Sequence, residues 1–331
     1  MTITIFSAHA FEQPYLTQAA AGQHQLRFVS EPLSLATAAQ AQGSEAVGLF
    51  TSDDASAPVL EKLHAAGVRY VAVRAAGHDN LDLAAATRLG LRVATVPLYS
   101  PYAIAEHTIA LILALNRRLH LADQQLRAND FRLDNLVGFD MHGKTVGIIG
   151  CGRIGGIIAR ILHGFGCHLL GYDVVPDPTL TAELGLTFVA LPDLYARADV
   201  ISLHAPLNEA TRHLIDAAAL AQMKPGVLLV NTGRGAELDT AAALAALQSG
   251  QLGYLGLDVY EHEHGLFFDD HSQEKPRDTT FAALLAQPNV LVTGHQAFLT
   301  REALTNLADA TMASLTCWAA GQPSATELAA G

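Results

Sequence analysis

Residues 145–155 read Thr-Val-Gly-Ile-Ile-Gly-Cys-Gly-Arg-Ile-Gly and are the most informative part of this sequence. An apolar run ends at Ile149, glycines stand at positions 150, 152 and 155, and a helical stretch follows to Leu162. A second apolar run then ends at Asp173. Strand, glycine-rich turn, helix and strand in this order are typical of a nucleotide-binding βαβ unit in a parallel sheet.

Each glycine of this turn has a separate physical role in holding a dinucleotide. Gly150 permits a tight turn, Gly152 lets the backbone approach a pyrophosphate, and Gly155 lets the helix pack closely on the sheet. The amino terminus of the helix adds N–H groups and a partial positive charge for the phosphates. A glycine-rich turn without a ligand is the alternative, but the strand before it and the helix after it favour a nucleotide site.

Asp173 indicates which dinucleotide this is. It lies 23 residues after Gly150, near the spacing expected for an acid that binds the ribose hydroxyls. A carboxylate there would repel a 2′-phosphate, and no arginine follows closely, so the sequence favours NAD over NADP. Cys151, inside the loop, is interpreted as a small filler and not as a nucleophile.

Short aliphatic runs alternate with alanine- and leucine-rich helical stretches through nearly the whole chain, which predicts a parallel α/β protein. Five strands wound with helices in the first hundred residues would form a small flavodoxin-like domain. The strands expected there are Ile3–Ser7, Leu26–Val29, Ala46–Phe50, Tyr70–Val73 and Arg92–Thr95, with helices at Pro58–Ala66 and Leu81–Leu89.

A second set of strands builds the nucleotide-binding domain. Pro101 opens a helix expected to run through Arg118 and beyond. Near-continuous apolar runs, as in strands covered on both faces, follow at Val146–Ile149, Leu169–Tyr172, Thr187–Val189, Val200–Leu203, Val227–Val230, Leu255–Asp258 and Val290–Thr293. Arg301–Ala320 is interpreted as one helix that returns to the first domain. The fold class is therefore α/β, with two doubly wound parallel sheets. A Rossmann domain (101–298) is inserted into a flavodoxin-like substrate domain (1–100 plus 299–331).

Composition and net charge indicate which kinds of partner and which cellular compartment to expect. The 331 residues are 50% hydrophobic and carry a formal charge of −12, which argues against nucleic acid or an anionic membrane as a partner. Three widely spaced cysteines without a Cys-x-x-Cys pair favour a reduced protein. The amino terminus lacks the pattern of a signal peptide and reads as a first strand. We therefore expect a cytoplasmic protein.

Three charged or polar residues follow the last predicted strands. Arg234 follows one strand, Glu263 follows the next, and His295 follows the last. Because ligands of a doubly wound sheet bind at the carboxyl ends of its strands, we expect these side chains to lie toward one cleft.

Their chemistry suits the oxidation of a 2-hydroxy acid or the reduction of a 2-keto acid. His295 can accept or donate the hydroxyl proton near neutral pH. Glu263 would orient the imidazole and stabilise its protonated form. Arg234 would hold the substrate carboxylate in a forked pair of hydrogen bonds. Each residue alone is a weak signal, because such residues after strands are often structural; together with the nucleotide site they favour catalysis.

With these motifs, nearly the whole chain resembles the D-isomer-specific 2-hydroxyacid dehydrogenase family, and within it most closely the fermentative D-lactate dehydrogenases. The ordered series is highly specific for the family and less specific for lactate. The matching segments are 74–82 (Arg-Ala-Ala-Gly-His-Asp-Asn-Leu-Asp), 96–101, 105–107, 147–155, 201–206, 231–235, 257–263, 267–270 (Phe-Phe-Asp-Asp) and 293–300.

The resemblance implies reduction of pyruvate to D-lactate with NAD as cofactor, and the same catalytic set of Arg234, Glu263 and His295. It implies substrate contacts from the backbone around Ala76 and Gly77, with Tyr99 and Phe298 lining the pocket. It further implies a hinged subunit that closes over its ligands, and a homodimer or homotetramer built through the nucleotide-binding domains. The cofactor contacts that it implies, besides the glycines, are Arg153, Ile154, Asp173, Ala205, Pro206, Thr211, Thr232 and Asp258.

One departure concerns substrate choice. Relatives of the lactate type usually carry an aromatic residue, commonly Phe, where this chain has His78, beside the carboxylate-binding loop. The exchange of one ring for another is one interpretation. The other is a shifted preference toward glyoxylate, hydroxypyruvate or a bulkier 2-keto acid, with His78 as a polar group in the substrate pocket.

Two further alternatives are open from the sequence. The run Glu261-His-Glu-His264 with Asp269-Asp-His271 could suggest a metal site, but its spacing is not that of a metal-binding helix, so no metal is expected. Some relatives of this fold are regulators that sense a dinucleotide, whereas the Arg–Glu–His set favours retained chemistry. A formate-type dehydrogenase would need no proton acceptor and hence no Glu263 behind His295.

Overall fold

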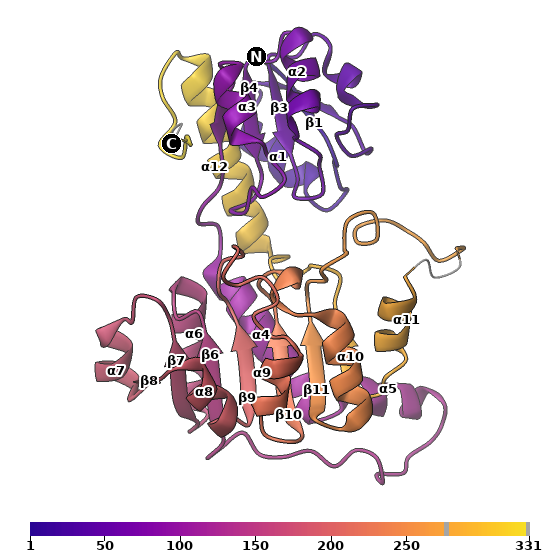
Figure 1. Cartoon of the computed structure of the whole chain (residues 1–331). Coiled ribbons are helices and arrows are strands. Elements are labelled where there is room, and N and C mark those ends of the chain that lie inside the picture. The colour runs from indigo at the N-terminus through magenta and orange to yellow at the C-terminus, as the bar shows by residue number, and fades with distance from the viewer. Residues whose placement is uncertain (275–277, 329–331) are drawn as a thin grey trace. The chain divides into compact units, whose positions relative to one another are not determined.

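The computed structural model describes residues 1–274 and 278–328, and the chain divides into two compact units (Figure 1). The first unit comprises Met1–Ser100 and Leu299–Gly331, and the second comprises Pro101–Phe298. Each unit has its own parallel sheet and its own hydrophobic cores, so each is described by itself.

The first unit has a five-stranded sheet in the order β2-β1-β3-β4-β5, with all pairs parallel. This is the strand order of flavodoxin-like proteins, as the sequence predicted. The central strand β3 is buried along its whole length, whereas β2 at the edge alternates between exposed and half-buried residues. The strands are β1 (Thr2–Ile5), β2 (Gln25–Phe28), β3 (Ala46–Leu49), β4 (Tyr70–Val73) and β5 (Arg92–Ala94).

Helices cover both faces of this sheet. One face packs against α1 (Gln13–Ala20) and α12 (Arg301–Ala319), and the indole of Trp318 stacks on Tyr70 with ring centroids 5.1 Å apart. The other face packs against α2 (Ala57–Ala65) and α3 (Leu83–Arg88), together with the short 3-10 helix η1 (Ala38–Ala41). The carboxyl-terminal helix therefore belongs to the first unit.

The second unit has a seven-stranded sheet in the order β12-β11-β10-β9-β6-β7-β8, again wholly parallel. The order reverses between β6 and β9, which is where a doubly wound sheet binds its ligand. The strands are β6 (Thr145–Ile149), β7 (His168–Tyr172), β8 (Thr187–Phe188), β9 (Val200–Leu203), β10 (Val227–Asn231), β11 (Leu252–Leu257) and β12 (Val290–Val292).

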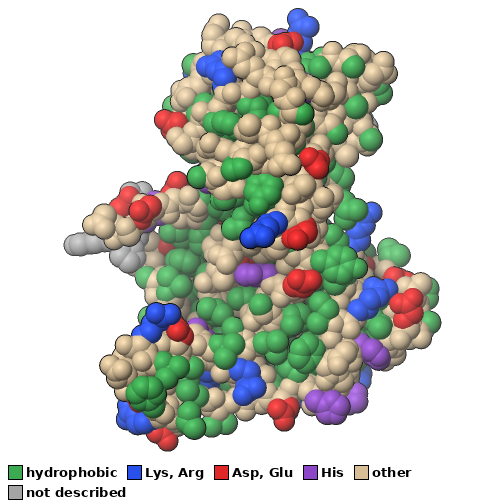
Figure 2. All heavy atoms as spheres, turned by 180° about the vertical axis from the view of Figure 1, so that it is seen from behind, with side chains coloured by type: hydrophobic (Ala, Val, Ile, Leu, Met, Phe, Trp, Pro, Cys, Tyr) green, Lys and Arg blue, Asp and Glu red, His purple; other side chains and the backbone are tan. Residues whose placement is uncertain are grey.

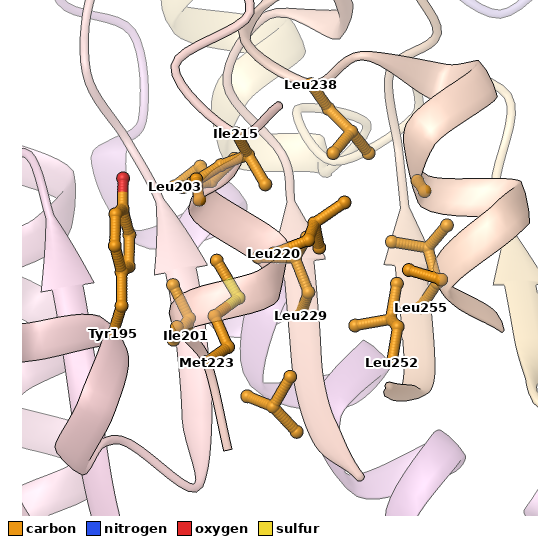
Figure 3. Close-up of a cluster of buried hydrophobic side chains, with 14 of the residues drawn as sticks. Tyr195, Ile201, Leu203, Ile215, Leu220, Met223, Leu229, Leu238, Leu252 and Leu255 are labelled. Atoms are coloured by element: carbon orange, nitrogen blue, oxygen red, sulfur yellow. The ribbon is translucent and has the colours of Figure 1, made fainter. Parts of the chain in front are cut away.

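Both faces of the second sheet are also covered. Helices α4 (Pro101–Asn116), α6 (Arg153–Gly164) and α7 (Pro178–Leu184) bury apolar side chains on one face. The opposite face holds the cluster in Figure 3, which includes Ile201 and Leu229 of the sheet and Leu220 of the helical layer. Two-sided burial explains the continuous apolar runs of these strands. The helices of this second layer are α8 (Leu191–Arg197), α9 (Ala217–Gln222), α10 (Thr240–Ser249) and α11 (Thr279–Leu285).

The helical stretch predicted from Pro101 through Arg118 and beyond is present, but it is divided into two helices. Helix α4 ends at Asn116, Arg118 is left-handed with φ of +49°, and a new helix, α5 (Leu119–Arg127), begins. The reason is tertiary, because the buried amide of Asn116 donates to the carbonyl of Phe139 over 2.7 Å and accepts from its N–H over 2.7 Å. The last residue of α4 is thereby held by a distant segment at the point where the helix ends.

Charged side chains on the face drawn in Figure 2 are scattered among hydrophobic side chains, other side chains and backbone, with Lys and Arg dispersed over the face. In the described part of the chain, every helix falls short of the combined length and apolar character that crossing a bilayer requires.

Candidate active site

The glycine-rich turn after β6 has the geometry of a dinucleotide cradle. Gly150 has φ of +88°, and a Cβ atom there would lie 2.5 Å from the carbonyl carbon of His204. A Cβ on Gly155 would collide with the carbonyl oxygen of Gly150. By contrast, a Cβ on Gly152 would meet no heavy atom within 4 Å, so the turn is open at the point where a pyrophosphate has to approach.

Beside this turn lies an open pocket of about 340 Å³, lined by Gly152, Arg153 at the start of α6, and Asp173, among others. The Asp173 carboxylate accepts hydrogen bonds from the N–H of Cys151 over 2.7 Å and from that of Val175 over 3.0 Å. These bonds hold the carboxylate at the pocket wall and leave lone pairs for the hydroxyls of a ribose. The residues therefore fit NAD, and the negative charge of Asp173 opposes a 2′-phosphate.

Cys151 fills space inside the glycine-rich turn and does not have the surroundings of a nucleophile, as predicted from the sequence. Its side chain is buried, and its thiol is within hydrogen-bonding distance of the carbonyl oxygen of Ile148. Burial, aided by the charge of Asp173, raises the pKa of the Cys151 thiol to about 12, so the reactive thiolate is suppressed at neutral pH.

His295 and Glu263 form a direct pair. The ring nitrogen Nδ1 of His295 lies 2.8 Å from Oε1 of Glu263, and the two side chains are 19% and 28% exposed. The other carboxylate oxygen of Glu263 accepts from the N–H of Tyr260 over 3.1 Å, which fixes the carboxylate behind the imidazole. In this arrangement Nδ1 is committed to Glu263, and Nε2 is the ring nitrogen available for proton transfer.

The loop that carries His295 is held by Asp258, at the end of β11. The Asp258 carboxylate is 1% exposed and accepts from the N–H groups of Gln296 (2.9 Å) and Ala297 (2.8 Å) and from the hydroxyl of Thr293 (2.5 Å). Nε2 of His107 lies 3.4 Å from the same carboxylate. Asp258 was expected from the resemblance as a cofactor contact; its observed bonds give it a structural role in the loop that carries His295.

Arg234 lies on the turn after β10, at the start of the 3-10 helix η2 (Gly235–Glu237). The Asn231 side chain braces this turn, donating to the carbonyl of Arg234 over 2.8 Å and accepting from the N–H of Gly233 over 2.9 Å. The guanidinium is half-buried and donates to the carbonyl of Gly233 over 3.0 Å. These contacts hold the guanidinium of Arg234 at the carboxyl edge of the sheet.

The turns that carry Arg234 and Glu263 pack against each other. A Cβ atom on Gly235 would collide with the backbone of Tyr260 and Glu261, so only glycine permits this close approach. Because β10, β11 and β12 are neighbours in the sheet, the three candidate residues follow adjacent strands. The structure thus brings His295 and Glu263 into contact and places Arg234 on the turn packed against that of Glu263.

The remaining expected cofactor residues lie in the same unit, on the turns around the switch point. Ala205 and Pro206 follow β9, and the Thr211 hydroxyl closes their turn by donating to the Pro206 carbonyl over 2.7 Å. The Thr232 hydroxyl, after β10, is hydrogen-bonded to that of Thr108 at 2.8 Å. Ile154 lies in the first turn of α6 and packs partly against the core.

The expected substrate residues Ala76, Gly77, His78 and Tyr99 belong to the first unit, and Phe298 ends the second. Ala76, Gly77 and His78 form the loop after β4, where Nδ1 of His78 lies 3.4 Å from the carbonyl oxygen of Ala76. The carbonyl of Tyr99 accepts from the side-chain amide of Asn306 over 2.6 Å.

Sequence reasoning missed the anchor of that loop. Arg74, 2% exposed, forms a buried ion pair with Glu12 at 2.8 Å and donates to the carbonyl of Phe6 over 2.9 Å. The ion pair ties the end of β4 to the start of α1, and the bond to Phe6 ties it to the end of β1, just before the loop of Ala76. Arg74 stood inside a quoted motif, but only the partner contributed by Glu12 reveals its role.

Phe268 is a second residue that received no role from the sequence. Its ring lies 5.8 Å from that of His295, centroid to centroid, and its backbone is left-handed with φ of +72°. Phe267 anchors the segment by packing on Phe281 at 5.8 Å. The only sequence signal was the Phe-Phe-Asp-Asp run, whose direction toward the imidazole depends on the backbone conformation at Phe268.

The acidic and histidine-rich segment after β11 has other partners. Glu261 pairs with His213 at 2.9 Å, Glu263 with His295, and His271 with Glu274 at 3.4 Å. Within residues 1–274 and 278–328, no three His, Cys, Asp or Glu side chains come together in a way that could hold a metal ion.

Comparison with known proteins places this site in a family. The NAD-binding domain of D-isomer specific 2-hydroxyacid dehydrogenases matches residues 109–297. The chain is 47% identical to D-lactate dehydrogenase of Escherichia coli, over 99% of this chain and 100% of that protein. It is 46% identical to 2-hydroxyacid dehydrogenase A of Aspergillus oryzae, over 95% and 91%.

Solved structures agree with this. The apo-structure of D-lactate dehydrogenase from Escherichia coli superposes with a TM-score of 0.90 at 45% identity, covering 99% of this chain and 100% of that one. The pyruvate reductase of Chlamydomonas reinhardtii superposes with a TM-score of 0.93 at 42% identity, covering 98% of each chain. The chain therefore belongs to the D-isomer specific 2-hydroxyacid dehydrogenase family, and it is an NAD-dependent oxidoreductase that acts on CH–OH groups.

Proposed function

We propose that this enzyme reduces pyruvate to D-lactate, with His295 as the acid–base residue, Glu263 as its support and Arg234 as the binder of the substrate carboxylate. The observation that carries the proposal is the 2.8 Å contact between His295 and Glu263 at the carboxyl edge of the nucleotide-binding sheet. It is a histidine backed by a carboxylate, which is the arrangement that proton transfer to a keto oxygen requires.

Bound NADH supplies the hydride that adds to the keto carbon. His295, protonated at Nε2, donates its proton to the carbonyl oxygen as that oxygen becomes a hydroxyl. Glu263 accepts the Nδ1–H hydrogen bond throughout and stabilises the charged imidazolium before transfer. In the reverse direction neutral His295 takes the hydroxyl proton, so the same pair serves both directions.

Arg234 would bind the substrate carboxylate with two parallel hydrogen bonds, which a planar guanidinium can form and an ammonium cannot. The brace from Asn231 and the packing of Gly235 keep its backbone in place. We further propose that Ala76, Gly77, His78, Tyr99 and Phe298 contact the substrate.

The residues that would hold NAD are those of the glycine-rich turn and of the turns at the switch point. Gly150, Gly152 and Gly155 would admit the pyrophosphate to the amino terminus of α6. Asp173 would bind the ribose hydroxyls. The other residues proposed to contact the cofactor are Arg153, Ile154, Ala205, Pro206, Thr211, Thr232 and Asp258.

Pyruvate is favoured because similar proteins are named D-lactate dehydrogenase and pyruvate reductase. A second candidate is a dehydrogenase for another 2-keto acid, such as glyoxylate, hydroxypyruvate or a bulkier acid. His78 favours it, as a polar ring on the loop proposed to bind substrate. A regulatory protein that senses NAD is a weaker candidate, since the His295–Glu263 pair supplies proton chemistry that sensing does not need.

The test is a substrate panel followed by NADH absorbance. We expect NADH oxidation with pyruvate and, in the opposite direction, NAD reduction with D-lactate but not L-lactate. Faster turnover of glyoxylate, hydroxypyruvate or phenylpyruvate would assign the second candidate. NADH binding without turnover of any of these acids would indicate that the protein is a regulator that senses NAD.

The role of His78 is tested by His78→Phe. The ratio of kcat/KM for pyruvate to that for each other acid should change if the imidazole contributes to substrate choice. Equal ratios in the two proteins would show that one ring replaces the other without consequence.

We also propose that the enzyme is a cytoplasmic homodimer or homotetramer. All three cysteines are free thiols, which suits a reducing compartment. A partner surface in the second unit is suggested by large apolar side chains that are more than half exposed, namely Leu119, Leu126, Phe131, Leu133 and Val137. Light scattering after gel filtration would give the subunit number, and a monomer would contradict this proposal.

A further inference from the structure

Glu237 is a buried carboxyl group on the turn that carries Arg234. It is the last residue of η2 and is 1% exposed. One of its oxygens, Oε2, accepts a hydrogen bond from the backbone N–H of Arg234 over 3.1 Å. The backbone N–H of Glu237 donates in return to the carbonyl of Arg234, also over 3.1 Å. A single side chain therefore closes the turn from which the guanidinium extends.

The carboxyl group also packs tightly against this turn. A Cβ atom on Gly233 would lie 2.7 Å from Oε2 of Glu237, so the space between them is filled. Among the described residues, no donor reaches the other oxygen, Oε1, although that atom is shielded from solvent. A buried oxygen without a partner is costly, and an apolar side chain of similar size would avoid that cost. The structure thus retains an acid where packing alone would favour a hydrocarbon.

The charge state of this acid is coupled to Arg234. Burial raises the pKa of Glu237 to about 7, and the positive charge of Arg234 opposes the rise. The titratable groups on the neighbouring segments have other partners, since His213 pairs with Glu261 and His204 is hydrogen-bonded to Ser202 at 2.6 Å. Arg234 is the charge that acts on the Glu237 carboxyl group.

We propose that Glu237 is a positioning residue for Arg234, whose hydrogen bond holds the arginine turn and whose ionisation weakens the binding of the substrate carboxylate. The inference rests on the proposed role of Arg234. With Glu237 uncharged, no charge from this turn opposes the attraction between Arg234 and an anionic substrate. With Glu237 ionised, its negative charge opposes part of that attraction, and the substrate binds less tightly.

Two variants of the full-length enzyme separate the hydrogen bond from the charge. Glu237→Gln keeps an oxygen that can accept from the Arg234 N–H but never ionises. Glu237→Leu keeps the volume and removes both properties. Glu183→Gln is the matched control, because it removes an exposed carboxylate on α7 of the same unit. The measurements are KM for pyruvate at pH 6 and pH 8, and the dissociation constant of NADH, which reports an intact nucleotide unit.

At pH 8 we expect KM for pyruvate to be about fivefold lower in Glu237→Gln than in the wild type, and at pH 6 to be nearly equal. All other groups are common to both proteins, so the ratio of their KM values isolates the effect of the side chain at position 237. At pH 6, where most of the wild-type carboxyl is uncharged, Glu237→Leu should raise KM about fivefold while NADH binding is unchanged.

The inference is overturned if KM of Glu237→Gln follows that of the wild type at both pH values. It is equally overturned if Glu237→Leu has the wild-type KM at pH 6. Arg234→Lys distinguishes this failure from that of the proposed function. If Arg234→Lys leaves KM and kcat unchanged, the assignment of Arg234 is wrong. If it raises KM and lowers kcat while the Glu237 variants behave as the wild type, only the role of Glu237 is rejected.

Discussion

The backbone N–H of His295 donates to the carbonyl oxygen of Asp258 over 2.7 Å, while the carboxylate of the same aspartate binds the two N–H groups that follow His295. These hydrogen bonds to the carbonyl and the carboxylate of Asp258 hold His295 in a left-handed conformation with φ of +53°, which costs an L-residue about 1–2 kcal/mol. The direction of the imidazole toward Glu263 therefore depends on an aspartate that does not contact its ring.

Asp258→Asn should loosen this catalytic loop. An amide cannot accept with its nitrogen, so one N–H group or the Thr293 hydroxyl loses its partner in a buried position. We expect the free energy of unfolding to fall by about 1–3 kcal/mol and kcat to fall with it. Calorimetry and steady-state kinetics measure both effects.

The matched control is Asp216→Asn. Asp216 caps α9 in the same unit, and asparagine is as good a cap as aspartate, so its melting temperature should be unchanged. Equal stability of the two variants would show that the Asp258 carboxylate does not hold the loop.

His295→Ala should lower kcat for pyruvate by about 10²- to 10⁴-fold, because the proton donor is lost. The dissociation constant of NADH should stay near its wild-type value, since the glycine-rich turn and Asp173 are untouched. His264→Ala removes an exposed histidine of the segment that also carries Glu263 and should keep wild-type kinetics. Comparable kcat values for the two alanine variants would reject the assignment of His295.

Asp173→Ala should weaken the preference for NADH over NADPH, which carries a 2′-phosphate. The carboxylate that would bind the ribose hydroxyls and repel a phosphate is gone, so KM for NADH should rise about tenfold or more and that for NADPH should fall. The readout is the ratio of kcat/KM for the two cofactors with pyruvate as substrate. An unchanged ratio would mean that specificity lies elsewhere in the pocket.

Glu237→Gln should alter the pH dependence of stability. Because burial raises the pKa of Glu237 to about 7, its stabilising contribution is complete below the unfolded pKa and is lost as pH rises through the folded value. Glutamine does not ionise, so Glu237→Gln does not lose this contribution. The difference between its free energy of unfolding and that of the wild type should therefore rise between pH 4.5 and 8, by up to about 3 kcal/mol.

Melting temperatures measured over this pH range test the prediction, with Glu183→Gln as the exposed control. A constant difference between Glu237→Gln and the wild type at every pH would show that Glu237 does not titrate near neutrality in the folded enzyme.

The order and identity of the elements were accessible from local patterns. Apolar runs bounded by glycine and polar residues marked strands such as β6 and β10, since strands covered on both faces have to be apolar along their whole length. The helix break at Arg118 was not accessible, because it coincides with the pairing of Asn116 with Phe139, which is distant in the chain.

The candidate site was likewise predictable in part from the sequence. The chain order of strands and turns was enough to propose Arg234, Glu263 and His295, because in a parallel sheet every residue that follows a strand lies at one edge. The contacts that anchor the candidate residues were not accessible. Asp258 and Phe268 act on the segment around His295, and the Arg74–Glu12 pair acts on the loop of Ala76, through contacts between segments far apart in sequence or through a left-handed backbone. Local composition specifies which elements form and what chemistry their ends can carry. The distances, burial and charge coupling that orient that chemistry arise only when distant segments pack together.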